Sequence, residues 1–144
     1  MNADEYQNIS NCLRKTIIKL VDKGVCYFGT GGALGFDTLA AQTILDLKNE
    51  HPHIKLILVL PCVSQTQHWH QKDVEIYEDI KAKCDKYVYT SENYNKGCMF
   101  KRNRHLVDNS GYCICYMTKN KGGTAYTVRY AKEKKLQIFN IADY

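Results

Sequence analysis

The sequence predicts an α/β protein with three layers, in which a doubly wound, mainly parallel sheet of about five strands lies between two layers of helices. Short apolar runs alternate with amphipathic helical patterns along the whole chain, and only a few residues connect one to the next. That alternation is typical of strand–helix–strand units, which place neighbouring strands parallel. We find no linker, repeat or low-complexity tract, so residues 1–144 are expected to form a single domain.

Helical periodicity accounts for five segments, each with one apolar face. They are residues 4–23, 36–49, 71–84, 98–108 and 124–134. The first segment carries Ile9, Leu13 and Ile17 on one face, and Gly24 ends it, as a glycine just past a helix does.

The strands are predicted from short apolar runs between the helices. They are residues 25–28, 54–60, 86–89, 112–117 and 137–141. The run at 54–60, IKLILVL, is apolar almost throughout, which indicates a strand covered on both faces. Pro61 follows it directly and stops the strand.

A glycine-rich turn joins the first predicted strand to the second predicted helix, in residues 25–37, VCYFGTGGALGFD. A second such turn, residues 122–124, leads into the last helix. Glycines let backbone approach a ligand closely, and the N–H groups of a helix N-terminus attract anions. Neither turn has the dinucleotide or P-loop spacing. Because the carboxyl ends of parallel strands share one edge, two such turns predict a phosphate-bearing ligand there.

Composition and charge argue against several classes of function. The net charge of +5 comes from scattered basic residues, so nucleic-acid binding is possible but not indicated. No apolar run is long enough to cross a bilayer and no signal peptide opens the sequence. The seven cysteines include no C-x-x-C pair, which favours free thiols in a reduced, cytoplasmic protein.

For several polar residues near the predicted ligand-binding edge, the sequence allows two roles, one structural and one in ligand binding. Asp37 either caps its helix or binds ribose hydroxyls. Arg102 and Asn103 either bind phosphate and a base or ribose, or belong to a solvated basic face. Arg129 either folds back on phosphate or makes a surface salt bridge. Thr124 is expected to cap the last helix and so aim its N–H groups at an anion.

The predicted ligand-binding set combines the two turns with these side chains. It consists of Gly31, Gly32, Gly35, Asp37, Arg102, Asn103, Gly122, Gly123, Thr124 and Arg129. We predict no catalytic residue, cofactor or metal, because no paired acid and base or nucleophile–base constellation can be assembled. His68 and His70 have no further metal ligands nearby in sequence. Trp69 either stacks on a base or packs against the helix that follows it, and Cys98 would be reactive only if exposed.

Four blocks of the sequence resemble the YpsA-like branch of the SLOG superfamily, which includes DprA-type and "lonely guy"-type domains. They are TGGALGFDTLAA at 30–41, IKLILVLPC at 54–62, GCMFKRNRHLVD at 97–108 and GGTAYTVRYA at 122–131. The resemblance runs from about residue 5 to 141. It implies a Rossmann-like fold that binds a nucleotide or a nucleotide-derived ligand.

The resemblance also bears on catalysis. Lonely-guy hydrolases carry P-G-G-x-G-T-x-E, whose glutamate takes part in cleaving an N-glycosidic bond, whereas Thr124 is followed here by Ala125, Tyr126 and Thr127. We therefore expect a non-catalytic sensor of a nucleotide-derived small molecule. A lonely-guy-like phosphoribohydrolase is the alternative, and a DprA-like nucleic-acid-binding module is the second alternative.

The resemblance further implies a first strand that this sequence lacks, since family members open with a strand and a T-G-H-R-P-like turn ahead of the first helix. Without it, the runs at 25–28 and 112–117 must pair directly or leave backbone groups unpaired. We expect the natural protein to have roughly 15–25 residues ahead of Met1. A homodimer that fills the gap is the alternative.

Overall fold

Residues 2–144 are described by the computed structural model, in which they form five α-helices, five β-strands and one short 3-10 helix. In chain order these are α1 (Ala3–Asp22), β1 (Tyr27–Thr30), α2 (Phe36–Leu47), β2 (Lys55–Leu60), α3 (Gln71–Lys83), β3 (Lys86–Tyr89), α4 (Cys98–Asp108), β4 (Tyr112–Cys115), α5 (Gly123–Glu133), β5 (Gln137–Asn140) and η1 (Ile141–Asp143). The predicted alternation of strand and helix is confirmed.

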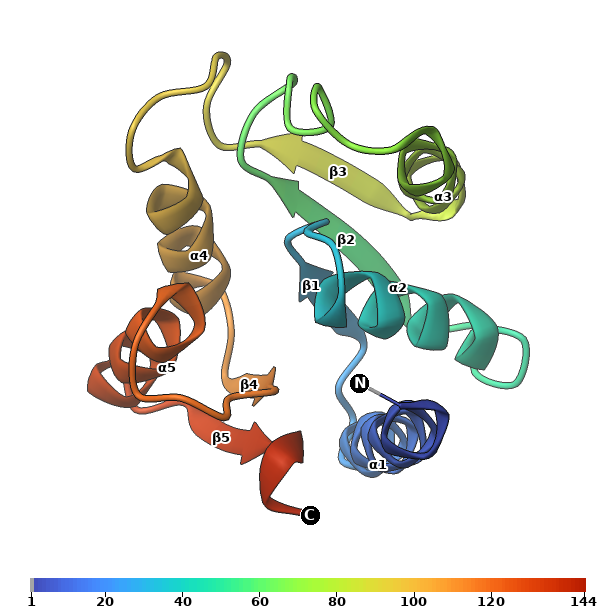
Figure 1. Cartoon of the computed structure of the whole chain (residues 1–144). Helices are drawn as coiled ribbons and strands as arrows, with labels where there is room; N and C mark the ends of the chain where they lie inside the picture. Colours follow the sequence, from blue (N-terminus) through green and yellow to red (C-terminus); the bar gives the residue numbers. More distant parts are fainter. Residues whose placement is uncertain (1) are drawn as a thin grey trace.

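The strands lie between two helical layers, as predicted. Helices α1, α2 and α3 lie on one side and α4 and α5 on the other (Figure 1). Every strand pair is parallel. The chain moves outward from β1 through β2 to β3, and α4 then brings it back to β4 and β5. The winding direction therefore reverses between β1 and β4, which is the topological switch point of a doubly wound fold.

The five strands are divided between two sheets rather than joined in one. Within residues 2–144, β1 pairs only with β2, and β4 pairs only with β5. The sequence left two outcomes for the runs at 25–28 and 112–117, which are direct pairing or unpaired backbone groups. These runs form β1 and β4, and they do not pair with each other. The strand expected ahead of Met1 lies outside the described residues.

Helix α1 begins and ends at local signals in the sequence. The Asn2 side chain accepts a hydrogen bond from the Glu5 N–H at 2.8 Å. This N–H lies in the first turn and has no carbonyl partner within the helix, so Asn2 caps it. At the other end Gly24 has φ +97°, and the Val25 N–H bonds the Leu20 carbonyl at 3.0 Å. This is the Schellman ending, and it confirms Gly24 as the residue that stops the helix.

The core is centred on β2, which has a strand on each side and helices on both faces. Leu56, Leu58 and Leu60 are at most 1% exposed, as the unbroken apolar run predicts. On α1, Leu13 and Ile17 are equally buried and extend this core toward β1.

Strand β4 is shorter than predicted, because a side chain takes over its pairing. The Met117 N–H donates to Asn140 Oδ1, and the Asn140 side-chain amide donates to the Met117 carbonyl, both at 3.0 Å. An asparagine thus replaces the next step of the backbone ladder beyond Cys115.

Within residues 2–144, no helix combines the length and the apolar character needed to cross a membrane. All seven cysteines are free.

Candidate ligand-binding site

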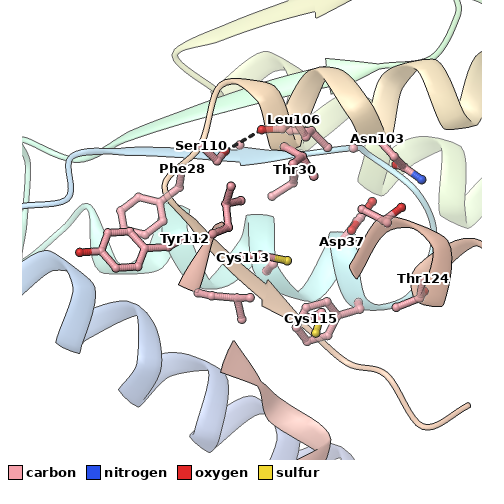
Figure 2. Close-up of a pocket in the computed structure, with 18 of the residues that line it drawn as sticks. Phe28, Thr30, Asp37, Asn103, Leu106, Ser110, Tyr112, Cys113, Cys115 and Thr124 are labelled. Atoms are coloured by element: carbon pink, nitrogen blue, oxygen red, sulfur yellow. Dashed lines mark hydrogen bonds between the residues drawn. The ribbon is translucent and has the colours of Figure 1, made fainter. Parts of the chain in front are cut away.

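A cavity of about 570 Å³ lies at the switch point, between the two sheets. Strands β1 and β4 form two of its walls, and residues of α1, α2, α4, α5 and the adjoining loops form the rest. The cavity is polar at one end and apolar at the other. Asp37, Asn103 and Thr124 gather at one end in Figure 2, and Phe28 and Tyr112 lie at the other.

The polar end contains six of the ten predicted ligand-binding residues. They are Gly31, Asp37, Arg102, Asn103, Gly123 and Thr124. They come from segments that follow β1, β3 and β4, so the fold brings together residues that are up to ninety-three positions apart in the sequence (124 − 31). Their meeting at one sheet edge follows from the parallel order of the strands.

Arg102 is buried rather than solvated, with 5% of its surface exposed. Its guanidinium donates to the Gly31 carbonyl and, through Nε, to Asn103 Oδ1 at 2.7 Å. A Cβ at position 31 would lie 2.9 Å from the same Nε, so only glycine leaves room for this contact. Arg102 therefore fixes the turn after β1 to helix α4.

Asp37 does not cap the N–H groups of α2. Its Oδ2 accepts a hydrogen bond from the Ala33 N–H at 3.2 Å, which closes the glycine turn on itself. Burial raises the pKa of Asp37, and the nearby Arg102 guanidinium opposes that rise. Burial likewise lowers the pKa of Arg102, and the Asp37 carboxylate opposes that change. Each of the two charges thus offsets part of the cost of burying the other.

Two helices begin at the polar end and supply hydrogen-bond donors. The first backbone bond within α5 runs from the Tyr126 N–H to the Gly122 carbonyl, and the corresponding bond in α2 starts from Leu39. Earlier N–H groups in each helix have no partner within the helix. Thr124 is not the cap that we predicted, because Gly122, with φ +98°, holds that position and no side chain caps the helix. The glycine's left-handed backbone ends the preceding loop without a capping side chain.

Buried polar atoms without a partner mark the same edge. Among the described residues these are Thr30 Oγ1, Gln65 Oε1 and Ser91 Oγ. Thr30 is the last residue of β1, and Gln65 and Ser91 follow β2 and β3. Because buried polar groups are normally hydrogen-bonded, three exceptions at one edge of the sheet indicate that this edge meets something polar. Thr30 also lines the cavity.

The other four predicted residues lie outside the cavity lining. Gly32 and Gly35, with φ of +71° and +88°, shape the turn before α2, and Gly122 caps α5. Arg129 is exposed and donates to the Asn120 carbonyl at 3.3 Å, so it braces the loop ahead of its own helix instead of making a salt bridge.

Sequence reasoning missed Thr30 and Gln65 as individual candidates. Thr30 could have been identified from its position at the end of a strand, at the predicted edge of the sheet. Gln65 could not, because its position depends on the conformation of the loop after β2. Trp69 packs edge-to-face on Tyr77 of α3 at 5.5 Å, as one of its two readings expects. Cys98 is fully buried, so the condition for its reactivity is not met. Within residues 2–144, no group of three or more potential side-chain ligands could hold a metal ion.

Comparison with known proteins gives one consistent family. The model of the YpsA family, described as the YspA SLOG family, matches residues 1–142. A UPF0398 protein of Brevibacillus brevis is 26% identical over 94% of this chain and 76% of its own length. The UPF0398 protein YpsA of Bacillus subtilis is 26% identical over 90% of this chain and 73% of its own. The SPbeta prophage-derived protein YoqJ of the same organism is 31% identical over 86% and 80%. The chain therefore belongs to the YpsA family of SLOG proteins.

Proposed function

We propose that this protein binds a nucleotide or a nucleotide-derived small molecule at the polar end of the cavity and does not transform it. One observation carries the proposal: the N-terminus of α5 and the buried, unpartnered hydroxyl of Thr30 line a single cavity at the switch point. Donors aimed at an open polar space suit an anionic ligand, and this is where doubly wound folds bind their ligands.

The arrangement assigns separate parts of a nucleotide to separate walls. The N–H groups of Gly123 and Thr124 at the start of α5 take the phosphate. Asn103 and the Thr30 hydroxyl bind ribose hydroxyls or a base edge. Phe36 and Tyr116 line the same cavity and stack on each other with centroids 6.2 Å apart, and they offer a wall for the base.

The alternative, hydrolysis of a nucleotide N-glycosidic bond, has one observation in its favour. Burial raises the pKa of Asp37, and a carboxyl group with a raised pKa is the usual donor in glycosidic cleavage. Against it, Asp37 already bonds the Ala33 N–H and faces Arg102, so its role in the turn is structural. The residues after Thr124 provide no carboxylate to replace it.

The experiment is a thermal-shift screen of mononucleotides, cyclic nucleotides and ADP-ribose derivatives, followed by calorimetry on the wild type and on Gly123→Val. At position 123 a Cβ meets no atom within 4 Å, so valine spares the unliganded fold and blocks only close approach of a phosphate. We expect affinity to fall about a hundredfold. Gly111→Val is the matched control, because Gly111 is equally unobstructed but lines the cavity just ahead of β4, at the end of that strand away from the start of α5.

Two outcomes would contradict the proposal. Absence of stabilisation by any compound would remove the binding function itself. Release of free base from a mononucleotide, abolished in Asp37→Asn, would replace the sensor with the hydrolase.

A further inference from the structure

Basic residues are concentrated in one part of the chain, although the whole sequence carries a net charge of only +5. Residues 96–135, which contain α4 and α5, include ten basic and two acidic residues, a net charge of +8. The rest of the chain includes ten basic and thirteen acidic residues, a net charge of −3. An asymmetry of this size within one chain points to an anionic partner on the basic side.

The fold places these cations at the surface and leaves them without acidic partners. Of the ten, Arg102 is buried, Arg104 is half-buried and the other eight are exposed. The salt bridges found within residues 2–144 all join residues between Arg14 and Asp85, so none involves a cation of residues 96–135. A polyanion bound here would relieve the mutual repulsion of these cations without breaking an ion pair.

Aromatic rings lie among these cations where α4 and α5 run side by side (Figure 1). The Phe100 and Tyr126 rings meet edge to face, with centroids 4.7 Å apart. Arg104 donates a hydrogen bond to the Tyr126 hydroxyl at 3.1 Å. One turn further along, the Tyr130 hydroxyl donates to Asp108 at 2.7 Å. We call the surface formed by these five residues the α4–α5 seam.

The seam is accessible and has an exposed lysine at each end. Phe100 is 41% exposed, and the exposed Lys101 follows it directly. At the other end, Lys134 Nζ lies 5.4 Å from the centroid of the Tyr130 ring. The 11 residues of α5 give the seam a length of about 16 Å. A stacked single strand of nucleic acid advances about 3.4 Å per nucleotide, so about four or five nucleotides fit along it.

We propose that the α4–α5 seam binds single-stranded nucleic acid. The exposed Phe100 ring stacks on a base, and Lys101 and Lys134 contact phosphates along the strand. Every base has an aromatic face and every nucleotide a phosphate, so rings set among cations bind single strands with little regard to sequence. A duplex keeps its bases stacked on one another and offers the ring no free base face.

Two other anionic partners match the charge of the seam but not its rings. A membrane surface attracts cations, but anchoring also needs apolar side chains that enter the lipid. Here the Tyr126 and Tyr130 hydroxyls are held in polar hydrogen bonds at the surface. An acidic peptide would pair with the lysines, but its carboxylates have no face to stack on Phe100.

The inference is independent of the proposed nucleotide site. None of Phe100, Arg104 and Tyr126 lines the cavity. A mononucleotide that occupies the cavity should therefore leave binding at the seam unchanged.

The test uses the full chain and fluorescent oligonucleotides of about fifteen nucleotides, as single-stranded DNA, single-stranded RNA and duplex DNA. We expect fluorescence anisotropy to show micromolar binding of the single strands at low salt. The duplex should bind at least about fivefold more weakly, because it lacks the stacked base. The logarithm of the affinity should fall with the logarithm of the salt concentration with a slope of about −3, as about four phosphate contacts require.

Substitutions separate stacking from charge. Phe100→Ala should weaken binding of single strands at least about fivefold. Lys101→Gln combined with Lys134→Gln should weaken it about tenfold and make the salt slope shallower by about one. The matched control is Lys15→Gln with Lys72→Gln, which removes the same charge from exposed positions on α1 and α3. It should change the affinity by less than about twofold, because these positions lie outside the seam.

One variant is expected to bind more tightly, a result that loss of folding cannot imitate. Asp108→Asn removes a negative charge from the seam and keeps an oxygen that accepts the Tyr130 hydrogen bond. We expect the affinity to rise about twofold to threefold at low salt, and the gain to disappear in high salt.

Three results would overturn the proposal. The first is no binding of either single strand; binding of phosphatidylglycerol–phosphatidylcholine vesicles in its place would assign the seam to a membrane. The second is binding of a polyglutamate peptide as tight as that of the oligonucleotides and unchanged by Phe100→Ala, which would leave only a general attraction for anions. The third is an equal loss in the control pair and the seam pair of lysine variants, which would place the contact elsewhere.

Discussion

The two sheets are built from similar apolar runs, yet they differ in how completely they are buried. In the three-stranded sheet, Leu56 and Leu58 of β2 are at most 1% exposed. In the two-stranded sheet, Ile114 of β4 is only half-buried and Tyr112 is 36% exposed. β2 has a neighbour on each side, whereas β4 has β5 on one side and the cavity on the other. Burial thus depends on the partners that a strand finds as much as on its own composition.

The largest expected effect comes from truncating the matched positions in the two sheets. Leu58→Ala leaves a cavity among close-packed neighbours and should lower the free energy of unfolding by about 2–5 kcal/mol. Ile114→Ala removes a side chain that already borders the cavity, so we expect a loss of about 1 kcal/mol. Urea denaturation of both variants measures the difference. Equal losses would show that the two sheets are packed alike and break the comparison.

An intermediate effect is expected at Asp85, which secures the three-stranded sheet where β3 begins. Its carboxylate accepts hydrogen bonds from Lys48 Nζ at 2.6 Å and from the Leu56 N–H at 2.8 Å. Burial acts to raise the pKa of Asp85, but these bonds outweigh it and the pKa is lowered from 3.8. Because this side chain is partly exposed, Asp85→Asn should cost about 1 kcal/mol at neutral pH.

The lowered pKa fixes the direction of the pH dependence. A carboxylate whose pKa is lower in the folded state stabilises the protein above its unfolded pKa and loses that contribution as the pH falls through its folded pKa. The difference between wild type and Asp85→Asn should therefore be constant near neutrality and shrink below about pH 4. Denaturation at several pH values checks this, and a difference that grows toward acid would contradict it.

The sequence predicted the elements well because their signals are local. The five helices and five strands follow from periodicity, and Gly24 stops α1 through its own backbone conformation. Errors arose where a distant group competes with a local one. Asn140, twenty-three residues away, ends β4 by bonding Met117, and no pattern in the run YCICYM indicates it.

The candidate site was predictable in its place but not in its contacts. Parallel strands bring their carboxyl ends together, so Gly31, Asn103 and Thr124 could be expected to meet. The role of Arg102 could not, because its guanidinium bonds a carbonyl seventy-one residues away and occupies the space that a Cβ at position 31 would take. We expected Arg102 either to bind phosphate or to be solvated. Neither expectation anticipated a buried side chain that holds the turn after β1 to α4. The division into two sheets depends on pairing between residues far apart in the sequence. From the sequence, the runs at 25–28 and 112–117 could either pair directly or stay apart, and the structure shows that they stay apart.

The smallest expected effect concerns the attachment of α1, the helix that covers the cavity beside the three-stranded sheet. Arg14 of α1 pairs with Asp46 of α2, but the two side chains are 40% and 58% exposed, and exposed pairs contribute about 0–1 kcal/mol. Arg14→Gln should therefore change the free energy of unfolding by less than about 0.5 kcal/mol. A double-mutant cycle with Asp46→Asn isolates the pair from other effects of each substitution.

Leu13, one position earlier, is fully buried against the core and provides the contrast in the same helix. If the apolar face holds α1 in place, the Arg14–Asp46 coupling energy stays within about 0.5 kcal/mol and falls further in high salt. A coupling well above that value would mean that α1 depends on α2 for its position. The position of the cavity wall that α1 forms would then depend on a surface ion pair. The buried side chains of α1 would not be enough to hold this helix against the three-stranded sheet.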